Sequence, residues 1–332
     1  MTDFVCIGDV TQDNFFFIND AEVHCDLRTD ECELALKYGE KIPAEDIGVS
    51  VGGNGGNVAA GLAKLGLRTK LLTVFGGDER GVWIKRQLLA ANVDLEDSVT
   101  EEKRMSNMAG IILFRRERTI LTYHAQGEAK LGEIPETKWI YVSSPAGKDQ
   151  GETYNAILKY KEQHKEVKIA ANPPLWDLKR GKETIQPVLG VLDVLILNWE
   201  EAETLLGSKK SKIKGQKSLS AKETLTQLAT MGPKVVVVTD GTNGAYAGDG
   251  KGFWFCKPYG MGAVEPTGAG DAFSSGFLAN YSQTGVAGMA MVWGAVNAFS
   301  VIQKIGGQAG LLSREEITVK PGQNPDWGPE EI

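Results

Sequence analysis

The chain of 332 residues is poor in cysteine and histidine, with 4 and 3 residues, and it lacks long apolar runs. None reaches the roughly 18 residues that a membrane helix requires. Four cysteines are too few for a disulfide framework in a chain of this length. The opening residues, MTDFVCIGDV, have neither a basic segment nor a long apolar core, so they predict no secretion signal. These absences predict a cytoplasmic protein without a membrane partner.

The charge is one-sided, because 43 acidic residues outnumber 36 lysines and arginines and give a net charge of −7. Nucleic acids favour a basic surface, so we expect no nucleic-acid partner. Apolar residues make up 42% of the chain and charged residues 24%, a balance that excludes disorder for most of it. Glycine is abundant, at 40 residues, and its concentration in a few loops marks them as candidate functional segments.

Segments typical of strands and helices alternate along most of the chain, and apolar runs such as Val-Val-Val-Val at 235–238 are typical of strands covered on both faces. This alternation predicts an α/β fold with a mostly parallel sheet and helices on both sides. Two segments of short strands and polar turns, 14–51 and 105–125, interrupt it, and we expect them to pair as a small β-sheet lid. The last residues, 321–332, are expected to be frayed. The remaining segments form the core: 1–13, 52–104 and 126–332.

The most distinctive motif is Glu265-Pro266-Thr267-Gly268-Ala269-Gly270-Asp271, which precedes a helical pattern. Gly268 and Gly270 let a ligand approach the backbone closely, and the free N–H groups and dipole of a helix N-terminus favour an anion. The motif therefore predicts a cradle for an oxyanion or a phosphate. The alternative reading of the residues is structural, with Asp271 serving as a helix N-cap.

A second glycine motif, Gly52-Gly53-Asn54-Gly55-Gly56-Asn57, also precedes a helical pattern. Its glycines leave room for a small polar molecule, and the Asn57 amide can both donate to and accept from a hydroxyl-rich ligand. A tight strand-to-helix turn is the structural alternative. The motif departs from the dinucleotide fingerprint, and the chain has no G-x-x-x-x-G-K-[ST] phosphate loop, so a dehydrogenase is not expected.

The order of these two motifs resembles that of the ribokinase-like (PfkB-type) carbohydrate kinase family, over about residues 4–312. Three later features strengthen the resemblance: Asn198-Trp199-Glu200-Glu201 matches an Asn-x-x-Glu motif, Thr239-Asp240-Gly241-Thr242-Asn243-Gly244 matches a nucleotide loop, and Asn297 precedes a Gly306-Gly307 turn. The resemblance implies a three-layer α/β sandwich with a mostly parallel central sheet and a β-sheet lid. It also implies ATP-dependent phosphorylation of a terminal hydroxymethyl group of a sugar of the ribose, fructose or 2-keto-3-deoxygluconate class.

The resemblance also implies roles for individual residues. Asp271 would be the base that faces the acceptor hydroxyl, with a pKa lowered by the helix dipole, and the backbone of Gly268, Ala269 and Gly270 would form the anion hole. The acceptor would be held by Asp13, Gly52, Gly53 and Asn57, with Asn172 supporting the site. The nucleotide side would consist of Asn198, Thr239, Gly241, Gly244 and Asn297, and Asn198 and Glu201 would position Mg²⁺ through water.

The chain departs from the family pattern in two places. Glu265-Pro266 stands where relatives often have Asp-Thr, and the missing proline N–H puts activation by K⁺ in doubt. The lid segment is longer than expected and contains Cys25 and Cys32. Their spacing matches no standard zinc pattern, so we expect free thiols there rather than a metal site or a disulfide.

Other parts of the lid leave alternatives open. Phe15, Phe16 and Phe17 alternate faces of a strand and are expected to pack, although one ring could line a slot for a nucleoside base. Arg115, Arg116 and Arg118 read as a charged hairpin turn that could otherwise reach an anionic acceptor. Pairing of two lids across a two-fold axis would cover their edges, so we expect a homodimer. A nucleoside kinase is the alternative activity, and a non-catalytic sugar or nucleotide sensor is the alternative of another class.

Overall fold

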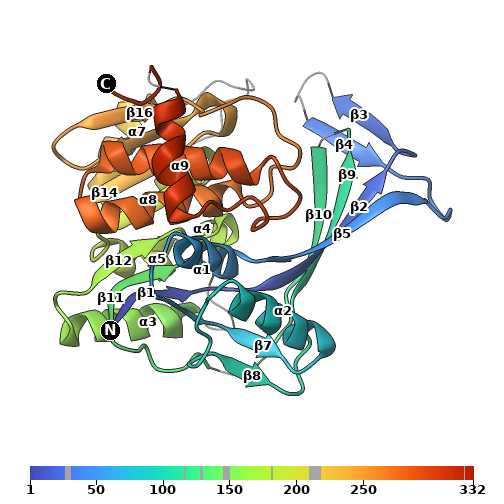
Figure 1. Cartoon of the computed structure of the whole chain (residues 1–332), viewed down its shortest axis with the longest axis horizontal. Coiled ribbons are helices and arrows are strands. Elements are labelled where there is room, and N and C mark those ends of the chain that lie inside the picture. The colour runs from blue at the N-terminus through green and yellow to red at the C-terminus, as the bar shows by residue number, and fades with distance from the viewer. Residues whose placement is uncertain are drawn as a thin grey trace.

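The computed structural model describes residues 1–26, 31–115, 117–127, 130–144, 150–180, 182–208, 218–324 and 326–332. Its main element is a sheet of nine strands in the order β17-β16-β15-β14-β13-β12-β11-β1-β6 (Figure 1). The six strands from β14 to β6 are parallel, and the other three are added antiparallel at one edge. In sheet order the strands are β17 (Pro329–Glu331), β16 (Phe253–Cys256), β15 (Ala245–Gly248), β14 (Val235–Thr239), β13 (Val194–Asn198), β12 (Lys168–Ala171), β11 (Thr137–Val142), β1 (Thr2–Ile7) and β6 (Thr69–Leu72).

Helices cover both faces of this sheet, and each face has its own hydrophobic core. Adjacent valines of β14 point to opposite cores, since Val237 packs in one and Val238 in the other. The three-layer α/β sandwich is therefore confirmed. One layer contains α1 (Asn54–Lys64), α2 (Glu79–Ala90), α8 (Ala269–Thr284), α9 (Ala287–Val301) and α10 (Arg314–Val319). The other contains α3 (Gln150–Gln163), α4 (Leu175–Arg180), α5 (Lys182–Leu189), α6 (Trp199–Leu206) and α7 (Ala221–Ala229). Two short 3₁₀ turns are η1 (Gly241–Asn243) and η2 (Lys320–Gln323).

A second sheet of four strands projects from the sandwich, on the right of Figure 1. Its order is β10-β9-β2-β5, and all pairs are antiparallel except β2 with β9. Phe15 is fully buried in a small core of this sheet, whereas Phe16, on the opposite face, is 40% exposed. The strands are β2 (Thr11–Ile18), β5 (Ala44–Gly52), β9 (Met108–Phe114) and β10 (Glu117–Tyr123). Two further pairs are β3 (Glu22–Asp26) with β4 (Glu31–Ala35), and β7 (Val74–Gly76) with β8 (Val99–Glu101).

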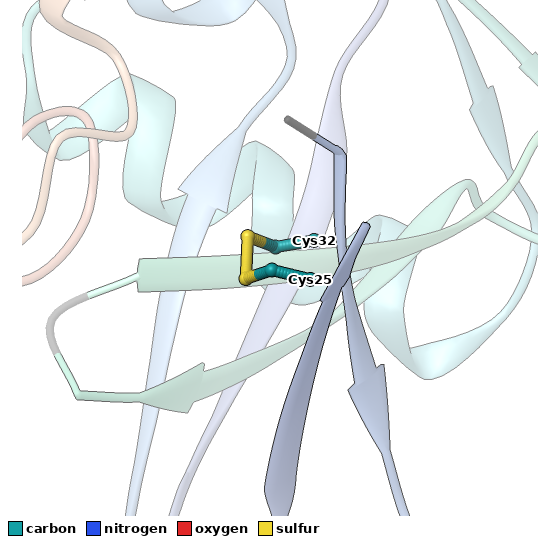
Figure 2. Close-up of a disulfide and its surroundings, with 2 residues drawn as sticks. All are labelled: Cys25 and Cys32. Carbon is teal, nitrogen blue, oxygen red and sulfur yellow. A yellow bond between two sulfur atoms is a disulfide. The ribbon is translucent and has the colours of Figure 1, made fainter. Parts of the chain in front are cut away.

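The β3–β4 hairpin is closed by a disulfide between Cys25 and Cys32 (Figure 2). The two residues lie directly opposite each other in the antiparallel register, with their Cα atoms 4.0 Å apart. The expectation of free thiols at these positions was therefore wrong. The residue spacing could not reveal the pairing, because it depends on the cross-strand register of a hairpin. Cys6 and Cys256 are free and buried.

The expectation of a frayed C-terminal tail was also wrong. Strand β17 pairs with β16 and forms one edge of the large sheet. Trp327 Nε1 donates to the carbonyl oxygens of Lys257 and Pro258, both at 3.1 Å, and Lys257 forms an ion pair with Glu330 at 2.6 Å. The tail is thus held by its pairing with β16 and by the hydrogen bonds of the Trp327 side chain. In the described part of the chain, no helix combines the length and apolarity needed to cross a bilayer.

Candidate active site

The two glycine motifs meet beside the carboxyl end of strand β1. The backbone of Gly8, which follows β1, is so close to α1 that a Cβ atom added to Gly8 would lie 2.8 Å from the Cα atom of Gly55. Glycine is therefore needed at both positions for α1 to begin here. In an open α/β sheet this is the edge at which ligands bind.

A side-chain hydrogen bond joins the two motifs. Asn57 Nδ2, in the first turn of α1, donates to Asp271 Oδ2 at 2.8 Å, although the two residues are 214 positions apart in the chain. Gln308 Nε2 in turn donates to Asn57 Oδ1 at 3.1 Å, which orients the Asn57 amide so that its NH₂ group faces the carboxylate. Gln308 was not predicted from the sequence. Its position directly after the Gly306-Gly307 turn is the feature that could have identified it.

The start of α8 has the features of an anion cradle. Gly268, the N-cap, has φ of 77°, and a Cβ atom there would lie 2.5 Å from the Cα atom of Gly307. No side chain caps this helix, so Asp271 does not serve as the N-cap, which was the structural alternative. In the described part of the chain the N–H groups of Gly270 and Asp271 have no backbone or side-chain acceptor. Open space also lies beside Gly270, where an added Cβ atom would meet nothing within 4 Å.

Asp271 is a stronger base than the helix dipole alone would make it. Its pKa is raised from the ordinary 3.8 to about 7, chiefly by burial. The hydrogen bond from Asn57 opposes the rise, and the negative charges of Asp9, Glu201 and Asp13 contribute to it. The expectation of a lowered pKa was therefore wrong. The physical reason for the difference is that a helix dipole stabilises a carboxylate by at most about 2 kcal/mol. This is less than the cost of desolvating a buried carboxylate.

Asp13 belongs to the same region, on the first half of lid strand β2. Its side chain is 5% exposed, and Oδ1 accepts a hydrogen bond from Thr11 Oγ1 at 2.6 Å. Burial raises its pKa to about 6, and the charges of Asp9 and Glu265 add to the rise. A Cβ atom at Gly52 would lie 2.0 Å from Asp13 Oδ2, so the glycine makes room for this carboxylate.

Asp9 is a third carboxylate here, and the sequence reasoning did not select it. It follows β1 in the Gly8-Asp9 pair, and this position at the end of a strand could have identified it as a candidate site residue. Its Oδ1 atom accepts from the backbone N–H of Asn54 at 3.2 Å, and burial raises its pKa. Gly53, with φ of 86°, passes so close that a Cβ atom would lie 2.6 Å from the Asp9 carbonyl oxygen.

Asn198 and Glu201 form a capping box at the start of α6. Asn198 Oδ1 accepts from the Glu201 N–H at 2.9 Å, and Glu201 Oε2 accepts from the Asn198 N–H at 2.8 Å. Asn172 Nδ2 donates to the Ile196 carbonyl oxygen at 2.9 Å and approaches Glu201 Oε2 at 3.4 Å. Glu201 Oε1 has no protein donor among the described residues, and burial raises the Glu201 pKa to about 7.

The predicted nucleotide residues divide into two groups. Thr239 ends β14, and the loop after it turns at Gly241 and Gly244, whose φ angles are 53° and 99°. Asn297, by contrast, is fully buried between α8 and α9. Its Nδ2 atom donates to the Ala272 carbonyl oxygen at 2.9 Å and to Ser275 Oγ at 3.2 Å, and its Oδ1 atom accepts from the Leu312 N–H at 3.1 Å.

Both amide protons of Asn297 are therefore donated within the protein, so in this structure the side chain joins α8 to α9; its position near the adenine stays a prediction.

The loop before α8 contains two orphaned oxygen atoms. Glu265 is fully buried, and its Oε1 atom accepts from the Thr267 N–H at 2.8 Å. Glu265 Oε2 and Thr267 Oγ1 are both buried without a hydrogen-bond partner. Such a pair suits a small monovalent cation, which prefers oxygen ligands. The described residues contain no cluster of three histidine, cysteine or acidic side chains that could by itself hold a metal ion.

Comparison with known proteins gives consistent matches over nearly the whole chain. The model of the pfkB family of carbohydrate kinases matches residues 12–314. The chain is 22% identical to the ribokinase of Haemophilus influenzae over 285 residues, covering 84% of this chain and 90% of the relative. It is 25% identical to the 5-dehydro-2-deoxygluconokinase of Shouchella clausii over 287 residues, covering 80% and 85%. The crystal structure of the nucleoside kinase of Methanocaldococcus jannaschii superposes with a TM-score of 0.75 at 18% identity, covering 98% and 99% of the two chains.

The structural likeness establishes the fold, and the family match spans both glycine motifs and the lid. The chain therefore belongs to the pfkB family of carbohydrate kinases.

Proposed function

We propose that the protein transfers the terminal phosphoryl group of ATP to a hydroxymethyl group of a small polyol held between the lid and the start of α8. The observation that supports this most directly is the 2.8 Å hydrogen bond from Asn57 to Asp271. It brings a hydroxyl-binding amide and a carboxylate of near-neutral pKa together at the entrance of an uncapped helix. Phosphoryl transfer needs this combination of positioning and charge stabilisation more than covalent chemistry.

In this proposal Asp271 orients the acceptor hydroxyl and receives its proton, and the backbone N–H groups at the start of α8 stabilise the charge on the phosphoryl group. Thr239, Gly241 and Gly244 contact the nucleotide. Bound Mg²⁺ would neutralise charge on the phosphates, and Glu201 would hold it through water at the free Oε1 atom. The lid would exclude water that could otherwise accept the phosphoryl group.

We include a monovalent cation beside this cradle in the proposal, in spite of the proline at 266. Glu265 Oε2 and Thr267 Oγ1 are orphaned buried oxygens that would serve as its ligands. Their loop leads directly into the anion cradle, so a bound cation would stabilise the shape of the cradle. K⁺ activation is accordingly part of the proposal. A rate that is unchanged when K⁺ is replaced by a large organic cation would contradict it.

A sugar of the ribose, fructose or 2-keto-3-deoxygluconate class is the proposed acceptor, and a nucleoside is the alternative. The relatives support both, since they include a ribokinase, a 5-dehydro-2-deoxygluconokinase and a nucleoside kinase. Of the lid phenylalanines, Phe15 is buried in the lid core and Phe16 lies on the face opposite Asp13. Phe17 shares the Asp13 face and is partly buried against the lid core, so a base slot could use this ring alone.

The test is ADP release from ATP, measured with each member of a panel of sugars and nucleosides. We expect release that depends on a sugar and is strongly reduced in Asn57→Ala. Turnover with nucleosides alone would favour the alternative acceptor. ADP release that no acceptor stimulates would contradict the proposed function and would favour a non-catalytic sensor.

We also propose a homodimer formed through the lid. The face of the lid sheet opposite Asp13 is apolar and exposed, since Ile47, Val49 and Leu121 are 68%, 53% and 63% exposed. A second copy of the same surface would cover it and protect the edge strand β5. Light scattering should give twice the chain mass for the parent and a monomer mass for Ile47→Asp. A monomeric parent at micromolar concentration would contradict the dimer.

A further inference from the structure

Three buried carboxylates lie around the start of α1, where the proposed acceptor binds. Asp9 accepts from the Asn54 N–H, Asp271 accepts from Asn57, and an added Cβ atom at Gly52 would meet Asp13. Asp9, Asp13 and Asp271 come from the end of β1, from the lid and from the start of α8, and each is at most 8% exposed. They act on one another electrostatically, since Asp9 and Asp13 raise the pKa of Asp271, and Asp9 raises that of Asp13. None of the three carboxylates forms an ion pair with a described residue.

Two basic groups act on Asp9 electrostatically, but neither forms an ion pair with it. His124, at the end of β10, favours the charged form of Asp9, but burial outweighs it and the pKa of Asp9 is still raised. Arg104 is 7% exposed and also senses the charge of Asp9.

The guanidinium group of Arg104 is committed elsewhere, however. Its terminal nitrogens donate to the carbonyl oxygens of Val74 at 2.7 Å and Ala125 at 3.1 Å and to Asn107 Oδ1 at 3.2 Å. The remaining nitrogen, Nε, faces Gly127, where an added Cβ atom would lie 3.2 Å from it. Arg104 therefore ties together the base of the lid, and its Nε atom is buried without a hydrogen-bond partner among the described residues.

The described arginines of the lid hairpin, Arg115 and Arg118, lie further out along the lid than Asp13. Asp13 pairs in register with Ala109 on β9, and Arg115 lies six residues further along. At the rise of an extended strand this places Arg115 roughly 20 Å from Asp13. Its guanidinium group instead stacks on Phe114, 4.9 Å from the ring centre. Arg118 pairs with Leu113, four residues from the partner of Asp13 on β9, or roughly 13 Å at the rise of an extended strand. Arg116 lies outside the described residues.

From this arrangement we infer that the site selects uncharged polyols and rejects acceptors that bear a carboxylate or a phosphate. The inference rests on the proposed kinase function and narrows its acceptor class. A hydroxyl can donate to the carboxylate oxygens of Asp9 and Asp13, whereas an acceptor anion would be repelled by them, because no described cation forms an ion pair or a hydrogen bond with any of the three carboxylates. Like charges brought together in a buried site weaken binding strongly, so we expect at least about 100-fold discrimination in kcat/KM.

The experiment compares acceptors that differ in charge. ADP release is measured with D-ribose and D-fructose, and with D-gluconate, 2-keto-3-deoxygluconate and D-fructose 6-phosphate. Asp13→Asn should lower kcat/KM for the neutral sugars and reduce the ratio between neutral and anionic acceptors at least tenfold, because it removes one of the three charges.

Asp46→Asn is the matched control. It makes the same charge change on the same lid, but Asp46 is exposed and pairs with Phe17, four residues from Asp13 along β2. The control should leave both kcat/KM and the charge ratio unchanged.

The outcomes separate the two proposals. Charge selection is supported if kcat/KM is at least about 100-fold higher for the neutral sugars than for every anionic probe, and if only Asp13→Asn reduces this ratio. A kcat/KM for any anionic probe that equals or exceeds those of the neutral sugars overturns it while the kinase function stands. A ratio that both variants change alike also overturns it. Absence of stimulated ADP release with every sugar overturns the kinase function and, with it, this inference.

Discussion

Replacing Asp271 with asparagine should make the protein more stable and much less active. The amide keeps the shape of the side chain and an oxygen that can accept from Asn57, but it cannot receive a proton. Loss of a general base lowers turnover by about 10²- to 10⁴-fold. The expected gain in stability arises because an uncharged amide avoids the desolvation that raises the pKa of the carboxyl group to about 7.

The sign and size of the stability change follow from proton linkage. Between pH 3.8 and about 7 the folded protein keeps a proton on Asp271 that the unfolded chain releases. The contribution of this group to stability therefore falls as the pH rises through that window. A shift of about three pKa units sets a ceiling of about 4 kcal/mol on the free energy that the substitution recovers above pH 7.

Urea unfolding of the parent and of Asp271→Asn, at pH 5 and pH 8, measures this effect. The variant should be the more stable protein at pH 8, and its advantage should be smaller at pH 5. Asp193→Asn is the control, because Asp193 is also buried but its carboxylate accepts from the Ile169 N–H at 3.0 Å and pairs with Lys234 at 2.8 Å. The control should be less stable than the parent. If Asp271→Asn is also less stable at pH 8, or turns over at the parent rate, the reasoning is refuted.

Three further predictions follow from the same structure. Because the pKa of Asp271 is about 7, kcat/KM should fall as the pH is lowered through 7, and initial rates that stay constant down to pH 5 would contradict this role. Gly268→Ala places a side chain at a φ of 77° and against Gly307, so it should cost about 1–3 kcal/mol in urea unfolding, whereas Gly270→Ala, which meets open space, should fold normally. Denatured protein should show two reactive thiols without reductant and four with it; four in both samples would exclude the hairpin disulfide.

Much of the fold could be predicted because its signals are local. The four-valine run of β14 indicated a strand buried on both faces, and the structure buries it between two cores. The glycines before α1 and α8 indicated close backbone approach, and the structure places Gly55 against Gly8 and Gly268 against Gly307 with no room for a side chain between them. These features depend on neighbouring residues, so a single sequence contains them.

The remaining features depend on contacts between distant parts of the chain. The disulfide of the β3–β4 hairpin and the pairing of the C-terminal strand follow from cross-strand register, which spacing along the chain does not determine. The pKa of Asp271 depends on burial and on Asp9, a residue 262 positions away whose own role was not predicted. Asn297 matched a family position, but only its packing between two helices shows that both of its amide protons are donated within the protein.

The central claim is that the turn before Asp271 is where a nucleotide phosphate meets an acceptor hydroxyl. A crystal structure with a non-hydrolysable ATP analogue, Mg²⁺ and D-fructose tests it most directly. The account predicts the terminal phosphate against the N–H groups of Gly270 and Asp271, with a sugar hydroxyl within hydrogen-bond distance of the Asp271 carboxylate and Asn57. A terminal phosphate bound away from the start of α8, or a sugar that contacts neither side chain, would contradict it.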